Sequence, residues 1–209
     1  MNKKNKILQL LVIIVTLSGL VVMAGWIFDI SILKSILPGW VTMKFSTALS
    51  FFLSGITLYF IAESQKKGLG IAQVVLSITT LCILLLMATL LISVFIGVRT
   101  GVEDLFVREA EGAVRTTTPG RPSVGTMINF ILIATAGIFT MLNMAKLKIK
   151  LLIAGGIVTV IGMVALIGYM LNKPVFYYTI EGFSTAMALH TAILFITSGI
   201  GLLLLGRVE

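Results

Sequence analysis

Six long stretches of the sequence contain no aspartate, glutamate, lysine or arginine, and this limits the possible folds more than any other feature. A helix needs about 20 mostly apolar residues to cross the roughly 30 Å of hydrocarbon in a bilayer. Backbone groups there find no water, so a spanning segment is either a helix or a strand of a closed barrel. The polar–apolar alternation of barrel strands is missing. The sequence therefore predicts an all-α integral membrane protein with six transmembrane helices: Ile7–Phe28, Phe45–Ala62, Leu69–Val98, Pro122–Ala145, Leu151–Asn172 and Gly182–Gly206.

The overall composition agrees with this class. Of the 209 residues, 58% are hydrophobic and 11% are charged, whereas about 25% are charged in soluble domains. The first stretch has 22 uncharged residues, longer than the roughly 7–15-residue core of a cleaved signal peptide, so we expect it to remain as a helix. No polar block is long enough for a separate catalytic domain. We therefore expect residues 1–209 to form a single six-helix transmembrane domain in the cell membrane.

The distribution of basic residues predicts the orientation. If the N-terminus is cytoplasmic, the cytoplasmic segments 1–6, 63–68, 146–150 and 207–209 contain nine of the 16 Lys and Arg residues. The other seven are spread over external segments of about twice that length. Short cytoplasmic loops are enriched in Lys and Arg, so both termini are predicted to be cytoplasmic. The net charge of +8 then reflects topology and attraction to membrane lipids, and no nucleic-acid partner is implied.

An internal repeat relates three pairs of spans. Residues 47–56 and 191–200 match at six of ten positions without a gap. The fourth span carries a weaker copy of the same pattern. In it, Thr126, Phe130 and Ala134 fall where Thr47, Phe51 and Gly55 fall in the second span. We expect three tandem helical hairpins over approximately residues 7–62, 69–145 and 151–206.

The repeat has two further interpretations. Small residues such as Ser46, Ser50 and Ser54, spaced every four positions, let membrane helices pack closely. Repeats also occur in transporters, but carriers typically place ionisable groups inside the membrane, and these spans contain none apart from one histidine. Close packing is therefore favoured over a transport path.

Two polar side chains inside predicted spans are candidate ligand-binding residues. His190 falls about two turns into the last span, near its external end, and histidine can change charge near neutral pH. The alternative is a neutral imidazole hydrogen-bonded to a neighbouring helix. Asn129 is the other deep polar residue. It is expected to hydrogen-bond between helices, with ligand contact as the alternative.

The longest loop runs from Arg99 to Arg121 and is predicted to be external. Its residues 102–114 are expected to form a short helix at the membrane interface. Arg121 is a candidate for clamping a carboxylate or a lipid phosphate, because guanidinium groups bind both in a bidentate manner. Alternatively, Arg121 pairs with Glu103 or Asp104, or lies against lipid headgroups.

Aromatic side chains cluster at the predicted external interface. Trp26 and Tyr169 are counted among the candidate ligand-binding residues, although an interfacial aromatic belt explains such residues equally well. The members of this group are Trp26, Trp40, Tyr169, Tyr177 and Tyr178.

No catalytic or metal-binding motif is present in the sequence. A phosphate-binding glycine loop and a His-Glu-x-x-His pattern are both missing. The lone cysteine, Cys82, excludes an internal disulfide and a cysteine-based metal cage. We therefore predict no catalytic residue, no metal site and no cofactor for this chain.

The repeated segments resemble the integral-membrane N-terminal sensory region that precedes PAS, histidine-kinase and diguanylate-cyclase domains in bacterial and archaeal signalling proteins. That region repeats a Met-x-x-x-Thr-Ala-x-x-Phe-x-Leu-x-Gly pattern. The resemblance covers nearly the whole chain, and two positions depart from it: Pro122 stands where the family has Met, and Met127 where it has Ala. The matching segments are Met43–Gly55, Met187–Gly199 with His190-Thr191-Ala192, Pro119-Gly120-Arg121, and residues 101–106.

The resemblance implies a sensory or signal-input module that passes an external or membrane stimulus to a cytoplasmic signalling domain or protein. Kinase-type outputs work as dimers, so it also implies a homodimer, by analogy. The sequence ends at Glu209. We therefore expect a non-enzymatic input domain of a longer histidine kinase or diguanylate cyclase, or a stand-alone relative that works with a partner. The alternatives are a small transporter or channel component and a structural subunit of a membrane complex.

Overall fold

The computed structural model describes residues 3–37, 39–177 and 184–207, and over these residues it contains helices and no strand. Six of the helices are long and apolar enough to cross a membrane, which confirms the predicted all-α class and the number of spans. The elements in chain order are α1 (Lys3–Ile27), α2 (Ser31–Lys34), α3 (Phe45–Lys67), α4 (Gly70–Ile96), the 3-10 turn η1 (Val102–Asp104), α5 (Val124–Met141), α6 (Leu147–Met170), η2 (Pro174–Phe176) and α7 (Leu189–Gly206).

The helix ends differ from the predicted spans. The spans stop at the first charged residue, whereas α1, α3 and α6 continue through lysines in their end turns, because Lys side chains can extend toward the membrane surface. The opposite error occurs in the last span. Its helix was predicted from Gly182 but begins at Leu189, since residues 184–188 are not helical. The predicted residues 182 and 183 lie outside the described part of the chain.

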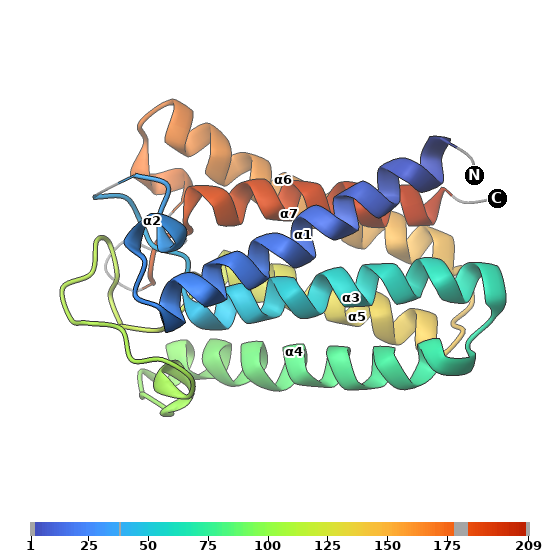
Figure 1. The fold of residues 1–209 in the computed structure, drawn as a ribbon, viewed down its shortest axis with the longest axis horizontal. Helices are drawn as coiled ribbons and strands as arrows, with labels where there is room; N and C mark the ends of the chain where they lie inside the picture. The colour runs from blue at the N-terminus through green and yellow to red at the C-terminus, as the bar shows by residue number, and fades with distance from the viewer. Residues whose placement is uncertain (1–2, 38, 178–183, 208–209) are drawn as a thin grey trace.

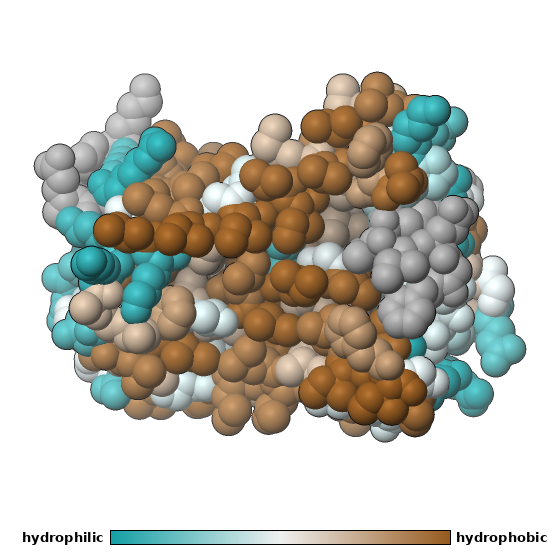
Figure 2. All heavy atoms as spheres, turned by 180° about the vertical axis from the view of Figure 1, so that it is seen from behind, coloured by the Kyte–Doolittle hydropathy of each residue, from teal (hydrophilic) through white to brown (hydrophobic). Residues whose placement is uncertain are grey.

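The six long helices form a bundle with three inner and three outer members. In their most apolar 18-residue windows, α3, α5 and α7 are 61%, 56% and 56% buried, against 28%, 39% and 39% for α1, α4 and α6. Helix α1 packs against α3 and α7, α4 against α3 and α5, and α6 against α5 and α7. Both termini lie at one end of the bundle (Figure 1), where Lys4 Nζ donates a 2.6 Å hydrogen bond to the carbonyl of Arg207. Hydrophobic residues cover the middle of the face seen in Figure 2, and hydrophilic ones gather toward its two ends.

Three phenylalanines close the centre of the bundle. Phe51, Phe130 and Phe195 are fully buried on α3, α5 and α7. Each ring contacts the other two, with centroid separations of 4.7, 4.8 and 4.9 Å. Edge-to-face and tilted aromatic pairs add about 0.5–1.5 kcal/mol each beyond the burial of their area. The three positions aligned by the sequence repeat therefore meet in one layer of the core.

Each outer helix is followed by a residue with positive φ and then by a short helical turn. The residues nearest these turns are Asp29 at 55°, Gly101 at 82° and Asn172 at 50°, and Gly97 at the end of α4 is a further one at 73°. Asp29, Gly101 and Asn172 are 72 and 71 residues apart, and Asp, Asn and Gly are the residues that adopt this conformation most readily. The short turns that follow them are α2, η1 and η2.

Glycines let two pairs of helices approach closely. A Cβ atom on Gly19 of α1 would lie 2.6 Å from the carbonyl oxygen of Ala48 on α3. In the same way, a Cβ atom on Gly162 of α6 would lie 2.8 Å from the carbonyl oxygen of Ala192 on α7. These glycines are 143 positions apart. Contact between backbones at this distance is the packing that small residues permit in membranes.

Candidate functional site

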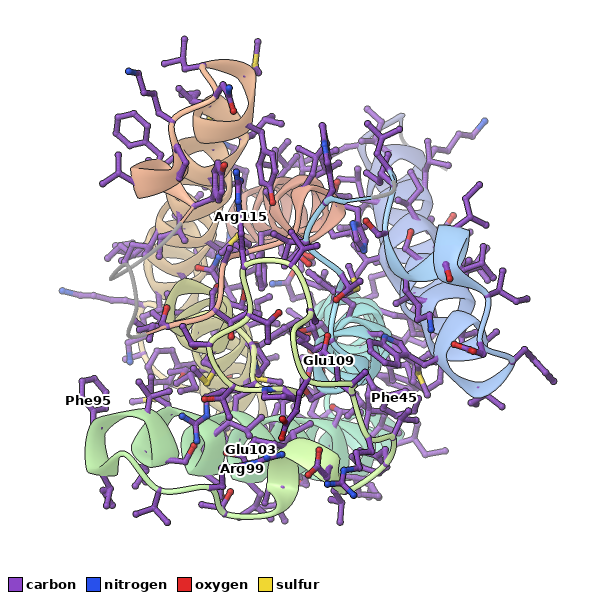
Figure 3. All side chains as sticks on the ribbon, turned by 90° about the vertical axis from the view of Figure 1, so that its left-hand side faces the viewer. Phe45, Phe95, Arg99, Glu103, Glu109 and Arg115 are labelled. Carbon is purple, nitrogen blue, oxygen red and sulfur yellow. The ribbon has the colours of Figure 1, made fainter. Side chains whose placement is uncertain are left out.

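The most elaborate polar network lies at the end of the bundle opposite the termini. We call this the loop end: it consists of residues 28–44, 97–123 and 171–188, as far as these are described. The opposite end, with the start of α1 and the end of α7, is the terminal end. Figure 3 looks onto the loop end, where the segment containing Glu103, Glu109 and Arg115 crosses the face of the bundle.

Glu103 and Arg121 form a buried ion pair. Glu103 is 4% exposed, and the Oε1 atom of its carboxylate accepts a 2.7 Å hydrogen bond from Arg121 Nη2. Ser93 and Thr100 also donate to this carboxylate. Burial favours the neutral carboxyl, but the hydrogen bonds from Arg121 and Thr100 outweigh it and hold the pKa of Glu103 below its ordinary value. Arg121 Nη2 also donates to the carbonyl of Val98 at 3.0 Å, which ties the start of α5 to the end of α4.

Glu109 and Lys44 form a second buried ion pair. Lys44 Nζ lies 2.6 Å from Glu109 Oε1, and both side chains are almost fully buried. The other oxygen of Glu109 accepts a 2.7 Å hydrogen bond from the backbone N–H of Gly120. Burial lowers the pKa of the Lys44 ammonium, against the attraction of Glu109. Because a buried ammonium needs a counter-ion, Glu109 fixes the loop to the residue that directly precedes α3.

Gly120 contacts both acidic residues: its N–H bonds to Glu109, and its Cα lies against the backbone of Glu103. Its φ of +75° is left-handed, and a Cβ atom there would collide with the backbone carbonyl of Glu103. Only glycine satisfies both conditions without strain. This gives the Pro119-Gly120-Arg121 motif a structural role.

The same loop is joined to the segment that leads into α7. The backbone N–H of Ala186 donates to the carbonyl of Arg115 at 3.1 Å, and the hydroxyls of Thr117 and Thr185 lie 3.4 Å apart. The Arg115 guanidinium donates to the hydroxyl of Tyr177 and lies over its ring, with 5.3 Å to the centroid. One loop therefore contacts the residues that precede α3, α5 and α7.

Trp26 and Tyr169 make matching internal hydrogen bonds. Trp26 Nε1 donates to the carbonyl of Met43 at 2.8 Å, and the Tyr169 hydroxyl donates to the carbonyl of Met187 at 2.8 Å. Tyr169 also stacks on Tyr177, with centroids 4.2 Å apart. These two candidate residues thus connect the end of an outer helix to the start of an inner one, and their polar atoms are engaged with the protein itself.

Asn129 and His190 lie apart from this network. Asn129 is fully buried on α5, and neither atom of its amide has a hydrogen-bond partner among the described residues. The expected interhelical hydrogen bond of Asn129 is therefore not formed within the described chain. His190 lies in the first turn of α7, not two turns into it, because α7 begins at Leu189. Its Nε2 is likewise buried without a described partner.

The expected interfacial helix over residues 102–114 is wrong. Only the three-residue turn η1 forms, and residues 105–123 are not helical. The carboxylate of Glu103 pairs with Arg121, and that of Glu109 pairs with Lys44. These ion pairs hold the backbone of the loop in a non-helical conformation. Phe106 stacks on Phe45, with centroids 5.3 Å apart. Of the alternatives for Arg121, pairing with Glu103 is the one observed.

Sequence reasoning missed Lys44 and Glu109. They are 65 positions apart, so no local spacing connects them. One signal was available: Lys44 directly precedes an uncharged span and carries the only charge between residues 35 and 62.

The lowered pKa of Glu103 predicts how the loop responds to acid. A carboxylate with a lowered folded-state pKa stabilises the fold above its ordinary pKa, and this stabilisation is lost as the pH falls through the lowered value. A fluorophore on the exposed position 111 (Glu111→Cys, with Cys82→Ser) reports on loop mobility through its anisotropy. We expect constant anisotropy from about pH 5 to 8 and a fall below about pH 4. A midpoint above pH 5 would contradict this assignment.

Among residues 3–37, 39–177 and 184–207, no group of three or more His, Cys, Asp or Glu side chains is placed to hold a metal ion. No family model, no curated protein and no solved structure matches the chain. The grounds for a function are therefore the six-helix architecture and the network at its loop end.

Proposed function

We propose that the chain is a membrane-embedded sensory or signal-input module that relays a stimulus from its loop end to a cytoplasmic domain or partner at its terminal end. One observation carries the proposal. The loop of residues 99–121 is bonded to the segment that begins α7, and α7 runs from there to the terminal end, beside the start of α1. A stimulus that binds two arrangements of the loop with different affinity then changes the position of α7.

The proposed architecture is three tandem hairpins, α1–α3, α4–α5 and α6–α7, with both termini in the cytoplasm. The layer of Phe51, Phe130 and Phe195 and the matching turns at Asp29, Gly101 and Asn172 support the repeat. The excess of lysine near the terminal end supports the orientation. The resemblance to the sensory regions of histidine kinases and diguanylate cyclases agrees with this proposal.

A transporter or channel component is the second candidate, and a structural subunit of a membrane complex the third. The aromatic layer argues against a pore along the bundle axis, because its three rings touch one another. Buried polar groups without a partner among the described residues, such as the Asn129 amide and the hydroxyls of Ser50 and Ser54, favour transport, since polar groups inside membranes often mark a pathway. Solute uptake or ion conductance by purified protein in liposomes would favour the second candidate over the sensor.

The relay is tested by removing one side-chain contact at the loop end and measuring the distance between two helices at the terminal end. Arg115→Ala removes the side-chain bonds to Tyr177, whose carbonyl accepts a 2.9 Å hydrogen bond from Met187 just before α7. Because Arg115 is exposed, the change leaves the core intact. Spin labels on the exposed positions 66 and 207, in a Cys82→Ser background, report the distance between the ends of α3 and α7. We expect a change of about 1–2 Å, the usual size of helix shifts in switching proteins.

Arg108→Ala is the matched control. Arg108 is an exposed arginine of the same loop, and its side chain has no hydrogen bond or ion pair with the described residues before α7. The Arg108→Ala substitution should leave the distance between the labels unchanged. Equal distances in the Arg115→Ala variant, the Arg108→Ala variant and the unmodified protein would refute the relay.

The orientation gives a separate prediction. Cysteines placed at Lys66 and Glu111, again with Cys82→Ser, lie at opposite ends of the bundle and are both exposed. In intact cells, an impermeant maleimide should label position 111 within minutes and position 66 only after the membrane is permeabilised. Labelling of both positions from the same side would show that the proposed topology is wrong.

A further inference from the structure

A groove of about 520 Å³ lies between α1 and α7, and residues of α2 also line it. Figure 1 shows α2 at the loop end of the bundle. Thirteen residues line it; ten are Ile, Leu or Val, three are polar and none is charged. Its volume is within the range of small-molecule sites, about 300–1,000 Å³. Along α1 the lining extends from Ile13 to Val22, which at 1.5 Å per residue is about 14 Å.

The groove is open on the side that faces lipid. Ile13, Leu17 and Val21 line it and are about half exposed, at 52%, 53% and 48%. These residues belong to the part of α1, residues 7–27, that contains no charged side chain. A ligand therefore enters from the hydrocarbon of the bilayer and must itself be largely apolar.

Three polar side chains line the groove, namely Ser18, Ser35 and His190. His190 lies in the first turn of α7, and its buried Nε2 has no partner among the described residues, whereas the Ser35 hydroxyl donates to backbone carbonyls. A bond from the imidazole to a ligand in the groove requires rotation about χ2, a torsion with broad minima in histidine. Ser46 and Gly125 take the corresponding positions of α3 and α5, each directly before the repeated threonine. The imidazole is therefore particular to this groove.

The lining also excludes other occupants. With no charged residue present, an ionic headgroup would be buried without a counter-ion, which is costly. An aliphatic chain with a small neutral head meets this condition, and it matches the elongated apolar lining along α1.

We propose that the groove between α1 and α7 binds a single-chain amphiphile with a neutral, hydrogen-bonding head group, which enters from the bilayer and bonds to His190. This deepens the proposed function by naming the class of stimulus, and it rests on that function only for the signalling role of the ligand. Binding itself depends on the groove and the histidine alone.

The test uses a brominated monoacylglycerol as probe, with the full chain in nanodiscs of unbrominated phosphatidylcholine. Bromine quenches tryptophan fluorescence at short range, and Trp26 lies one helical turn beyond Val22 on α1. Trp40→Phe leaves Trp26 as the single tryptophan. We expect saturable quenching that unbrominated monoacylglycerol reverses.

Two valines provide a matched pair of variants. Val21→Phe places a ring in the groove, whereas Val74→Phe makes the same change at a lipid-facing position of α4 that is 59% exposed. We expect saturable quenching to be lost with Val21→Phe and retained with Val74→Phe. Equal saturation curves for the two variants, or quenching that rises linearly with probe content, would show annular lipid contact only and overturn the proposal.

The histidine is tested by two further substitutions. His190→Ala should weaken the apparent affinity about tenfold, the value of one hydrogen bond to a buried group. His190→Gln keeps a hydrogen-bonding group and should bind within about twofold of the unmodified protein. Unchanged affinity in His190→Ala would refute the role of the imidazole.

The binding measurement and the distance measurement together distinguish failure of this inference from failure of the proposed function. If the probe binds saturably but leaves the distance between labels at positions 66 and 207 unchanged, the binding site stands and the signalling role fails. If the distance changes with Arg115→Ala but no saturable binding is found, the relay stands and this site is refuted.

Discussion

Replacing Gly199 with alanine is expected to lower the unfolding temperature of the protein by roughly 2–12 °C. A Cβ atom at this position would lie 2.8 Å from the carbonyl oxygen of Gly155 and would also collide with the side chain of Thr159. The first of these atoms belongs to the backbone of α6 and yields only if the two helices separate. Overpacking of this kind costs about 1–3 kcal/mol, and each kcal/mol lowers the melting temperature by about 2–4 °C in a chain of this size.

Gly156→Ala is the matched control for this prediction. Gly156 is the neighbour of Gly155 on the same helix, but a Cβ atom there meets no other atom within 4 Å. Alanine is the better helix former by up to about 1 kcal/mol, so the unfolding temperature should stay the same or rise slightly. Thermal unfolding in one detergent, followed by circular dichroism, compares the two variants. Equal losses would mean that α6 and α7 do not pack as closely as described.

The sequence predicts the spans well because one physical quantity determines them. Charged side chains are expensive in hydrocarbon, so the uncharged runs mark the helices. The helix ends are harder to predict, because they depend on backbone conformation. Ala188 has φ −68° and ψ 151°, values of extended backbone, and α7 therefore begins only at the next residue. No composition rule distinguishes the apolar residues before Leu189 from those after it.

Contacts in the core can be predicted from the sequence more readily than contacts at the loop end. The sequence repeat aligns Phe51, Phe130 and Phe195, and the structure shows that they touch. The partner of Glu103, Arg121, lies in the same loop and is among the pairings expected from the sequence. The partner of Glu109 lies 65 positions away and follows no repeat. Long-range ion pairs of this kind depend on how the finished helices meet, which a single sequence does not reveal.

Lys44→Met is expected to destabilise the protein by about 3–5 kcal/mol, because it leaves the carboxylate of Glu109 buried without its counter-ion. The double variant Lys44→Met, Glu109→Gln removes the unpaired charge as well. It should regain most of the lost stability, since a buried ion pair often adds little over well-packed neutral groups. A double-mutant cycle on denaturant unfolding gives the coupling between the two residues directly.

Lys34→Met is the control that distinguishes the effect of leaving a carboxylate buried without a partner from the effect of losing an ion pair. Lys34 pairs with Asp29, and their side chains are 13% and 91% exposed. Removal of Lys34 leaves only an exposed carboxylate in contact with water, and such pairs contribute about 0–1 kcal/mol. We expect Lys34→Met to change stability by less than about 1 kcal/mol, against the several kcal/mol of Lys44→Met. Similar effects of both substitutions would mean that water reaches Glu109 and that the loop is not fixed to α3. In that event a stimulus at the loop would have no rigid connection through which to act on the helices.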